Sequence, residues 1–372
     1  MIGQASKGRP SDSRYLPLKQ PVNCREAHYF MLTNKIKSTI INISILIASF
    51  VIPIIFAEVI LTFLGMADPM IYRSNPIYGY EPIPNQSSNR LGVPIFINNI
   101  GLRDNENYTN LERSNTLLVI GNSVAYGGSR IKQEDLFTEI LETKLKIHKP
   151  LIKVYNAGVN GYSISQMISR TKSLLNKIDP EYIIMYVIME DFLRAPRTLI
   201  TENNFVYPTK KPSSALGHFL LLSINYLNRR YNFLDYLPSS IAQWFLPPEN
   251  YSARYNKSNI KEIHINAIET FVNDVWEASR HSRHKIFVFL APTRQDILIN
   301  RRNNNTYLQL KFESMNIHFY VLQPDFYAAI INKGKDIDDY YWDSVHYREK
   351  GHSLAADVIY RYLILNEDFK AN

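Results

Sequence analysis

The sequence predicts an α/β protein with a doubly wound parallel sheet, preceded by a transmembrane helix and interrupted by an aromatic-rich insertion. Three observations support this prediction. Short apolar runs alternate with amphipathic helical segments between residues 116 and 365, as they do in a parallel sheet that helices cover on both faces. Twenty residues without charge, 38–57, precede that region. Phenylalanine, tyrosine and tryptophan are frequent in residues 192–260, where the alternation stops.

The first segment, residues 1–37, is a basic tail. It holds seven lysine and arginine residues against two acidic residues, which is +5 of the net charge of +8 of the 372-residue chain. The rest of the chain is close to neutral and has no stretch that alternates basic and aromatic residues, so we expect no nucleic-acid partner. Residues 1–30 lack hydrophobic periodicity and are predicted to be unstructured. Met31 is an alternative start of translation.

Residues 38–65 form the predicted transmembrane helix. At about 1.5 Å per residue, the uncharged part alone spans roughly the 30 Å of a bilayer core. A cleavable signal peptide is the alternative, since Gly65-Met66-Ala67 resembles a processing site, but signal peptides have apolar regions of only about 7–15 residues. Because the basic tail precedes the helix, we expect the N-terminus in the cytoplasm and the bulk of the chain on the periplasmic or extracellular side.

The remaining boundaries follow from composition. Residues 66–110 are rich in proline and are expected to form an extended linker and edge segment. Residues 111–366 form the predicted sheet domain, and residues 367–372 form a short tail. The single cysteine, Cys24, excludes an intrachain disulfide and a cysteine-ligated metal cluster. We predict neither a metal nor a cofactor.

Each element of the sheet domain is predicted from its own run of side chains. Near-continuous apolar runs predict five parallel strands, at residues 116–121, 152–158, 181–189, 284–292 and 317–323. Amphipathic runs predict the helices between and after them, at residues 135–147, 163–178, 261–280, 306–316 and 351–365. Within the insertion, residues 218–237 predict one or two further amphipathic helices. Ligands of such sheets bind outside the carboxyl ends of the strands.

Glycine and polar residues gather after the first two strands and before the last helix. Gly121-Asn122-Ser123 follows the first strand, and Gly158 to Gly161 follow the second. Glycines in such turns let backbone amides face a bound group. Ser123 can act as a nucleophile if His346 serves as its base and Asp343, three residues earlier, orients that base. The sequence therefore predicts a serine hydrolase.

The order and spacing of these residues resemble the SGNH, or GDSL-type, hydrolases. Four blocks of the family are matched in order, by Gly121-Asn122-Ser123 for GDS, by Gly161 for the second-block glycine, by Glu190-Asp191 for GxND, and by Asp343 with His346 for DxxH. The resemblance covers about residues 75–366. It implies the SGNH hydrolase fold, a flavodoxin-like doubly wound sheet, with a triad of Ser123, Asp343 and His346. It also implies an oxyanion hole formed by Ser123, Gly161 and residue 190.

Two positions depart from the family pattern. Asn122 replaces the aspartate of GDS, a side chain that mainly shapes the turn. Glu190 stands where the family has an oxyanion-hole asparagine, and an ionised carboxylate cannot donate a hydrogen bond. Three explanations stay open: Glu190 is protonated, the amides of Ser123 and Gly161 suffice, or the protein is weakened or inactive as a catalyst. For the first, we expect Glu190 to be buried beside Asp191.

The resemblance implies a membrane-anchored serine esterase of the cell envelope, which removes O-acyl groups from a polysaccharide or lipid substrate through an acyl-Ser123 intermediate. An O-acyltransferase would use the same residues, with a sugar hydroxyl in place of water. A catalytically inactive module that binds glycan is the third class. The insertion 192–260 follows the third strand and is therefore expected at the rim of the site, as a lid, an acceptor-binding wall, a packed insertion or a membrane-facing collar.

Overall fold

The computed structural model describes residues 24–109, 113–199, 208–231, 236, 238, 260–281, 284–300, 306–366 and 369. The chain divides into two compact units, Met1–Ala57 and Glu58–Asn372. The first unit contains most of helix α1 (Cys24–Phe63), and the second contains all the described strands and the candidate site.

Helix α1 is long and apolar enough to cross a membrane. Residues His28–Phe63 meet the length and the composition of a membrane span. Apolar side chains are exposed along this helix, whereas the apolar side of a soluble core helix is buried. The helix begins at Cys24, earlier than the predicted start at residue 38, and includes the end of the region 1–30 that was expected to be unstructured. Residues 24–37 contain neither proline nor glycine, so nothing interrupts the helix there.

Residues 66–110 are more regular than the extended linker that their prolines predict. They contain two antiparallel hairpins, β1 (Tyr72–Asn75) with β2 (Gly79–Pro82), and β3 (Gln86–Arg90) with β4 (Val93–Ile97). Proline is tolerated at strand ends and on edge strands. Side chains of both hairpins are buried in the core, namely those of Tyr72, Tyr80, Ile95 and Ile97. This segment therefore belongs to the folded domain.

The central sheet has five parallel strands in the order β6-β5-β7-β8-β9. They are β5 (Thr116–Gly121), β6 (Lys153–Asn156), β7 (Tyr182–Val187), β8 (Lys285–Leu290) and β9 (His318–Val321). Strand β6 lies on one side of β5, and β7, β8 and β9 lie on the other side, so the winding reverses at β5. The predicted five-stranded, doubly wound sheet is confirmed.

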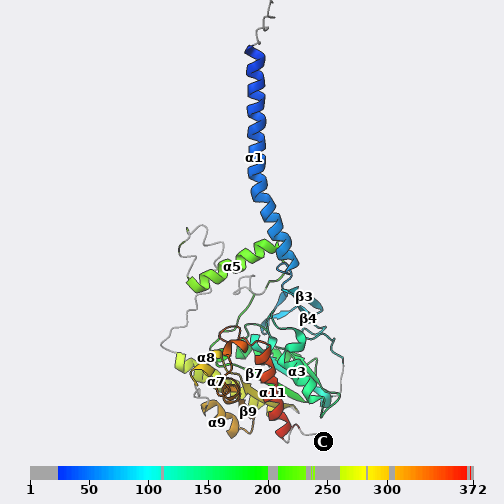
Figure 1. Ribbon diagram of the computed structural model, residues 1–372. Coiled ribbons are helices and arrows are strands. Elements are labelled where there is room, and N and C mark those ends of the chain that lie inside the picture. The colour runs from blue at the N-terminus through cyan, green and yellow to red at the C-terminus, as the bar shows by residue number, and fades with distance from the viewer. Residues whose placement is uncertain are drawn as a thin grey trace, which may run out of the picture. The chain divides into compact units, whose positions relative to one another are not determined.

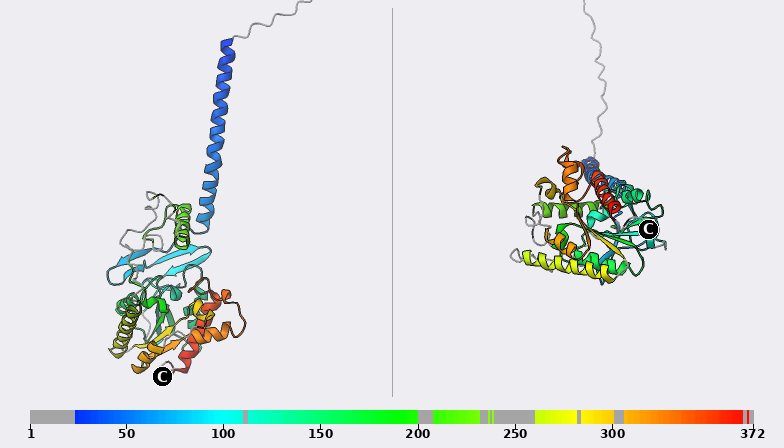
Figure 2. Two further views of the ribbon diagram at one scale, coloured as in Figure 1. Left: turned by 90° about the vertical axis from the view of Figure 1, so that its left-hand side faces the viewer. Right: turned by 90° about the horizontal axis from the view of Figure 1, so that it is seen from below.

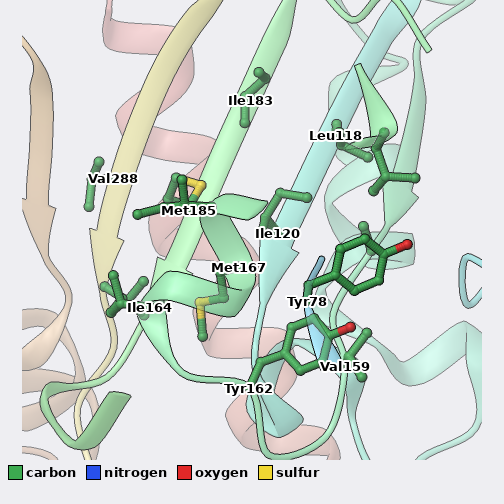
Figure 3. Packing of buried hydrophobic residues seen from close by; sticks show 14 of the residues in the cluster. Tyr78, Leu118, Ile120, Val159, Tyr162, Ile164, Met167, Ile183, Met185 and Val288 are labelled. Carbon is green, nitrogen blue, oxygen red and sulfur yellow. The ribbon is translucent and has the colours of Figure 1, made fainter. Parts of the chain in front are cut away.

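One face of the sheet is covered by α4 (Ile164–Leu174), α7 (Ile260–His281) and α9 (Thr306–Ser314). Alternate strand residues point toward these helices, because side chains of a strand alternate between its two faces. Those drawn in Figure 3 are Leu118, Ile120, Ile183, Met185 and Val288.

The opposite face is covered by α3 (Phe137–Leu145), α10 (Gln323–Ile330) and α11 (Glu349–Leu365). Figure 2 shows the sheet between α7 on one side and α11 on the other. Helix α10 and the shorter α8 (Arg294–Leu298) were not predicted. A helix of so few turns is too short to show a clear hydrophobic periodicity.

The insertion 192–260 is described in part. Helix α5 (Ala215–Tyr231) begins three residues before the amphipathic segment predicted at 218–237. Part of the insertion's aromatic residues, such as Phe205 and Trp244, lie outside the described residues. Whether the insertion forms a lid, a wall or a packed insertion stays a prediction.

Candidate active site

Ser123 lies at the sharp turn between β5 and the one-turn helix α2 (Ser123–Tyr126). The residue before it, Asn122, caps that helix, because its Oδ1 accepts a hydrogen bond of 2.7 Å from the amide of Val124. This fits the turn-shaping role that the resemblance implies for the position. The turn presents the half-buried Ser123 at the carboxyl edge of the sheet.

The structure brings the three predicted catalytic side chains together. Nε2 of His346 lies 2.8 Å from Oγ of Ser123. On the other side of the ring, Nδ1 lies 2.8 Å from Oδ2 of Asp343 and 3.0 Å from Oδ1. In this arrangement the imidazole can accept the proton of the hydroxyl group while the carboxylate holds the ring.

The loop between α10 and α11 holds the carboxylate of Asp343 in place. Oδ1 accepts hydrogen bonds of 2.9 Å from the amides of Val345 and His346. Partial burial raises the pKa of Asp343, but these two bonds and the bond from the His346 ring outweigh it and hold the pKa well below its usual range. Asp343 is therefore ionised at neutral pH and can stabilise an imidazolium ion.

The backbone amides of Ser123 and Gly161 are the expected oxyanion donors. Within the described residues, neither the amide of Ser123 nor that of Gly161 donates a hydrogen bond to the chain. The loop that carries Gly161 lies against the nucleophile turn, because the amide of Val159 donates to the carbonyl oxygen of Gly121 at 3.1 Å. Gly161 has a φ of 77°, which is unstrained for glycine alone.

The first hairpin supports that loop, a role that the sequence did not reveal. The hydroxyl group of Tyr80 in β2 donates to the carbonyl oxygen of Asn160 at 2.5 Å. In return, the hydroxyl group of Tyr162 donates to the carbonyl oxygen of Tyr80. Both contacts join residues about 80 positions apart in the chain, and no local pattern signals such a pairing. The residues on either side of Gly161 are thus held by β2.

The expectation that Glu190 is buried is wrong. Its side chain is exposed, in the short 3-10 helix η3 (Met189–Phe192) that follows β7. The buried carboxyl group is that of the next residue, Asp191, whose exposure is 1%. Successive side chains of a helical turn point in different directions, so the two carboxyl groups cannot both face the core. Without burial, the hypothesis of a protonated Glu190 loses its physical cause.

Asp191 instead completes the nucleophile turn. Nδ2 of Asn122 lies 2.8 Å from both carboxyl oxygens of Asp191. The amide of Ile188 donates to Oδ2 at 3.0 Å, and Nη1 of Arg194 lies 3.1 Å from Oδ1. Burial raises the pKa of Asp191 to about 7, against the opposing effects of Arg194, Ile188 and Asn122. These contacts join the turn after β5 to the turn after β7.

Arg103 fixes the loop that follows α2. It is buried, and its guanidinium group donates to three carbonyl oxygens, those of Tyr126 at 2.5 Å, Gly128 at 2.7 Å and Ile131 at 2.6 Å. A single buried cation thus satisfies three backbone acceptors near the nucleophile. The sequence indicated no role for this side chain.

Trp342 lies in the loop that carries Asp343 and His346. The guanidinium carbon of Arg348 lies 3.6 Å from the centre of the Trp342 rings, and that of Arg130 lies 5.3 Å away. The amide of Trp342 donates to the carbonyl oxygen of His346 at 2.8 Å. The cation–π contacts therefore stabilise the loop that carries the candidate base.

The described residues contain no group of three His, Cys, Asp or Glu side chains placed to hold a metal ion. What the site offers is a hydroxyl group, an imidazole, a carboxylate and two backbone amides. This set suits nucleophilic acyl transfer.

No family model matches the chain, and no curated protein matches it. Comparison with solved structures gives low similarities. A catalytic mutant of Axe2, an acetylxylan esterase from Geobacillus stearothermophilus, is 15% identical with a TM-score of 0.42, over 71% of this chain and 100% of that chain. A two-domain esterase active on acetylated mannans is 12% identical with a TM-score of 0.40, over 69% and 50%. LAE5, an α/β hydrolase from the metagenome of Lake Arreo, is 12% identical with a TM-score of 0.41, over 71% and 100%.

Proposed function

We propose that this chain is a membrane-anchored serine ester hydrolase of the SGNH type, which removes O-acyl groups from a polysaccharide or lipid of the cell envelope. The observation that carries the proposal is the continuous chain of hydrogen bonds from Ser123 through His346 to Asp343. The four sequence blocks support the reaction class, and the length of α1 supports the anchor. The N-terminus then lies in the cytoplasm and the catalytic domain on the outer side.

The geometry supports a two-step reaction. Oγ of Ser123 attacks the carbonyl carbon of the ester while Nε2 of His346 takes the hydroxyl proton, and the amides of Ser123 and Gly161 donate to the oxyanion. The ester C–O bond then breaks, and His346 returns the proton to the departing alcohol. Water attacks the acyl-Ser123 with the same base, which releases the carboxylic acid and restores the hydroxyl group.

The exposure of the triad favours water as the acceptor. The side chain of Asp343 is 52% exposed and that of His346 is 39% exposed. An acyltransferase has to keep water away from its acyl-enzyme. The described residues leave the triad open to water, and we therefore place hydrolysis before transfer to a sugar.

The proposal is tested by covalent labelling. A fluorophosphonate probe is expected to label the full-length protein on Ser123, since His346 makes that hydroxyl group nucleophilic. Ser123→Ala should abolish labelling, whereas Ser165→Ala, which changes a serine in α4, should leave it intact. A wild-type protein that is folded but takes up no probe would support the inactive glycan-binding module instead.

Replacement of Glu190 tests the source of the oxyanion donors. If the amides of Ser123 and Gly161 suffice, Glu190→Gln should retain wild-type kcat/KM, because the substitution then removes no oxyanion donor. The activity of both proteins against a simple aryl acetate is compared across pH, and no Glu190-dependent decline is expected at alkaline pH. A loss of activity on the order of 10²-fold in Glu190→Gln would show that the Glu190 side chain takes part in catalysis.

A further inference from the structure

Helix α5 presents several large apolar side chains to solvent. Its large exposed side chains are those of Phe219, Leu220, Tyr226, Leu227 and Tyr231. They follow the spacing i, i+1, i+7, i+8 and i+12, which places them all on one side of a helix. In the first turn of the helix, Ala215 and His218 are buried. The helix is therefore buried at its first turn and exposes apolar side chains along the turns that follow.

A contiguous apolar surface of this kind marks a site of interaction. Leucine and phenylalanine suit the boundary between lipid headgroups and acyl chains, and tyrosine is enriched at that depth. The sequence of α5 contains no aspartate or glutamate. This composition is compatible with the headgroups of anionic lipids.

The start of α5 is tied to the end of the apolar span. One end of α5 lies beside the last turns of α1 (Figure 1). The carboxylate of Glu58, in those last turns, accepts hydrogen bonds from Oγ of Ser214 at 2.8 Å and from the amides of Ala215 at 2.7 Å and Leu216 at 2.9 Å. A carboxylate at a helix N-terminus satisfies amides that have no partner within the helix. Glu58 is also the first charged residue after the uncharged run 38–57. The contact therefore places the first turn of α5 next to the point where the chain leaves that run.

Two further contacts hold the segment before α5 to the residues after α1. Lys211 forms an ion pair with Asp68. The amide of Tyr72 donates to the carbonyl oxygen of Pro208 at 2.9 Å. The start of α5 is thus held by three independent contacts.

We propose that α5 is an interfacial helix, whose exposed face lies in the outer surface of the lipid bilayer beside the end of the transmembrane helix. This inference rests on the membrane anchor of the proposed function. It gives the domain a second attachment to the membrane, at the level where α1 ends. The catalytic domain is then held against the lipid surface by two helices.

Fluorescence quenching by lipid tests this proposal. Because Cys24 is the only cysteine, a Cys24→Ser background accepts single cysteines for an environment-sensitive fluorophore. Leu220→Cys reports on α5, and Leu310→Cys in α9 is the matched control, since the two leucines are 50% and 60% exposed. Ile47→Cys, in the middle of the uncharged run, reports on the span itself. The full-length variants are reconstituted in vesicles of phosphatidylcholine and phosphatidylglycerol, with and without brominated acyl chains.

The expected result is a loss of roughly half of the fluorescence at position 220 in brominated lipid, at the shallow depth of an interfacial helix, a loss at position 47, and no change at position 310. Quenching at 47 without quenching at 220 would overturn the proposal and leave the membrane anchor intact. No quenching at either position would reject the anchor as well. A blue-shifted emission at 220 without quenching would identify a protein surface, such as a second copy of the chain, as the occupant and would also overturn the proposal.

Discussion

Ser123→Ala is expected to reduce hydrolysis of a simple aryl acetate on the order of 10⁴-fold or more, because no other atom of the site can form the acyl-enzyme. His346→Ala should cause a loss of similar size, since the hydroxyl group then has no base within 2.8 Å. The two effects should not add, because the residues act as a unit. The double variant Ser123→Ala with His346→Ala is therefore expected to be no slower than either single variant. The measurement is kcat/KM of purified full-length protein.

Carboxylate variants in the same region supply the control. Asp343→Asn keeps the size of the side chain but favours the wrong tautomer of His346, and a loss of roughly 10⁴-fold is expected. Asp339→Asn changes an exposed carboxylate four residues earlier, which pairs with Lys350 at 2.6 Å. Surface ion pairs contribute little, so Asp339→Asn should stay within about twofold of wild type. Equal activity in the Asp339 and Asp343 variants would show that Asp343 does not orient the base.

Asn122→Asp, the substitution that restores the family's GDS block, is expected to destabilise this protein. It places a second carboxyl group about 2.8 Å from that of Asp191, at a site where both side chains are buried. An uncompensated buried charge costs about 3 kcal/mol or more of unfolding free energy. Adding Asp191→Asn removes one of the two carboxyl groups and should recover at least half of that loss. Urea unfolding of the detergent-solubilised proteins, followed by tryptophan fluorescence, measures these differences.

The pH dependence of this destabilisation has a defined sign. Two adjacent buried carboxyl groups raise each other's pKa above the value of about 4 that they have in the unfolded chain. A group with a raised pKa in the folded state contributes stability that is present at low pH and is lost as pH rises. Asn122→Asp should therefore lie close to wild type near pH 4 and fall furthest below it near pH 8. An Asn122→Asp variant equally stable at both values would show that the two side chains are not in contact.

The strands and the candidate triad could be predicted because their signals are local. Each strand is a short apolar run that can be recognised without knowledge of its contacts. Ser123, Asp343 and His346 occur in short motifs, after the first strand and before the last helix. The parallel order of the strands then brings those ends to one edge of the sheet. The distance of 2.8 Å between Ser123 and His346 spans 223 positions of the chain, but each half of the pair was visible in its own motif.

The features that the sequence did not reveal depend on contacts between distant segments. Tyr72 of β1 and Tyr80 of β2 pack into the core, although the prolines of residues 66–110 suggested irregular structure. Glu190 and Asp191 are adjacent carboxylates, and which one is buried depends on Asn122, 69 residues away from Asp191. Arg103 stands next to Asp104 in the sequence, but its three carbonyl partners lie 23 to 28 residues further on. No periodicity or spacing within one segment carries this information.

The contacts of Arg103 and Tyr80 have a practical consequence for producing the domain without its membrane helix. A recombinant fragment that starts at residue 111, where the sheet domain was predicted to begin, omits the guanidinium group that binds three carbonyl oxygens after α2 and the hydroxyl group that binds Asn160. Such a fragment would keep all three triad residues but lose these hydrogen bonds to the loops beside them. A fragment that keeps these hydrogen bonds has to begin before β1. The hairpins and the sheet therefore have to be expressed together.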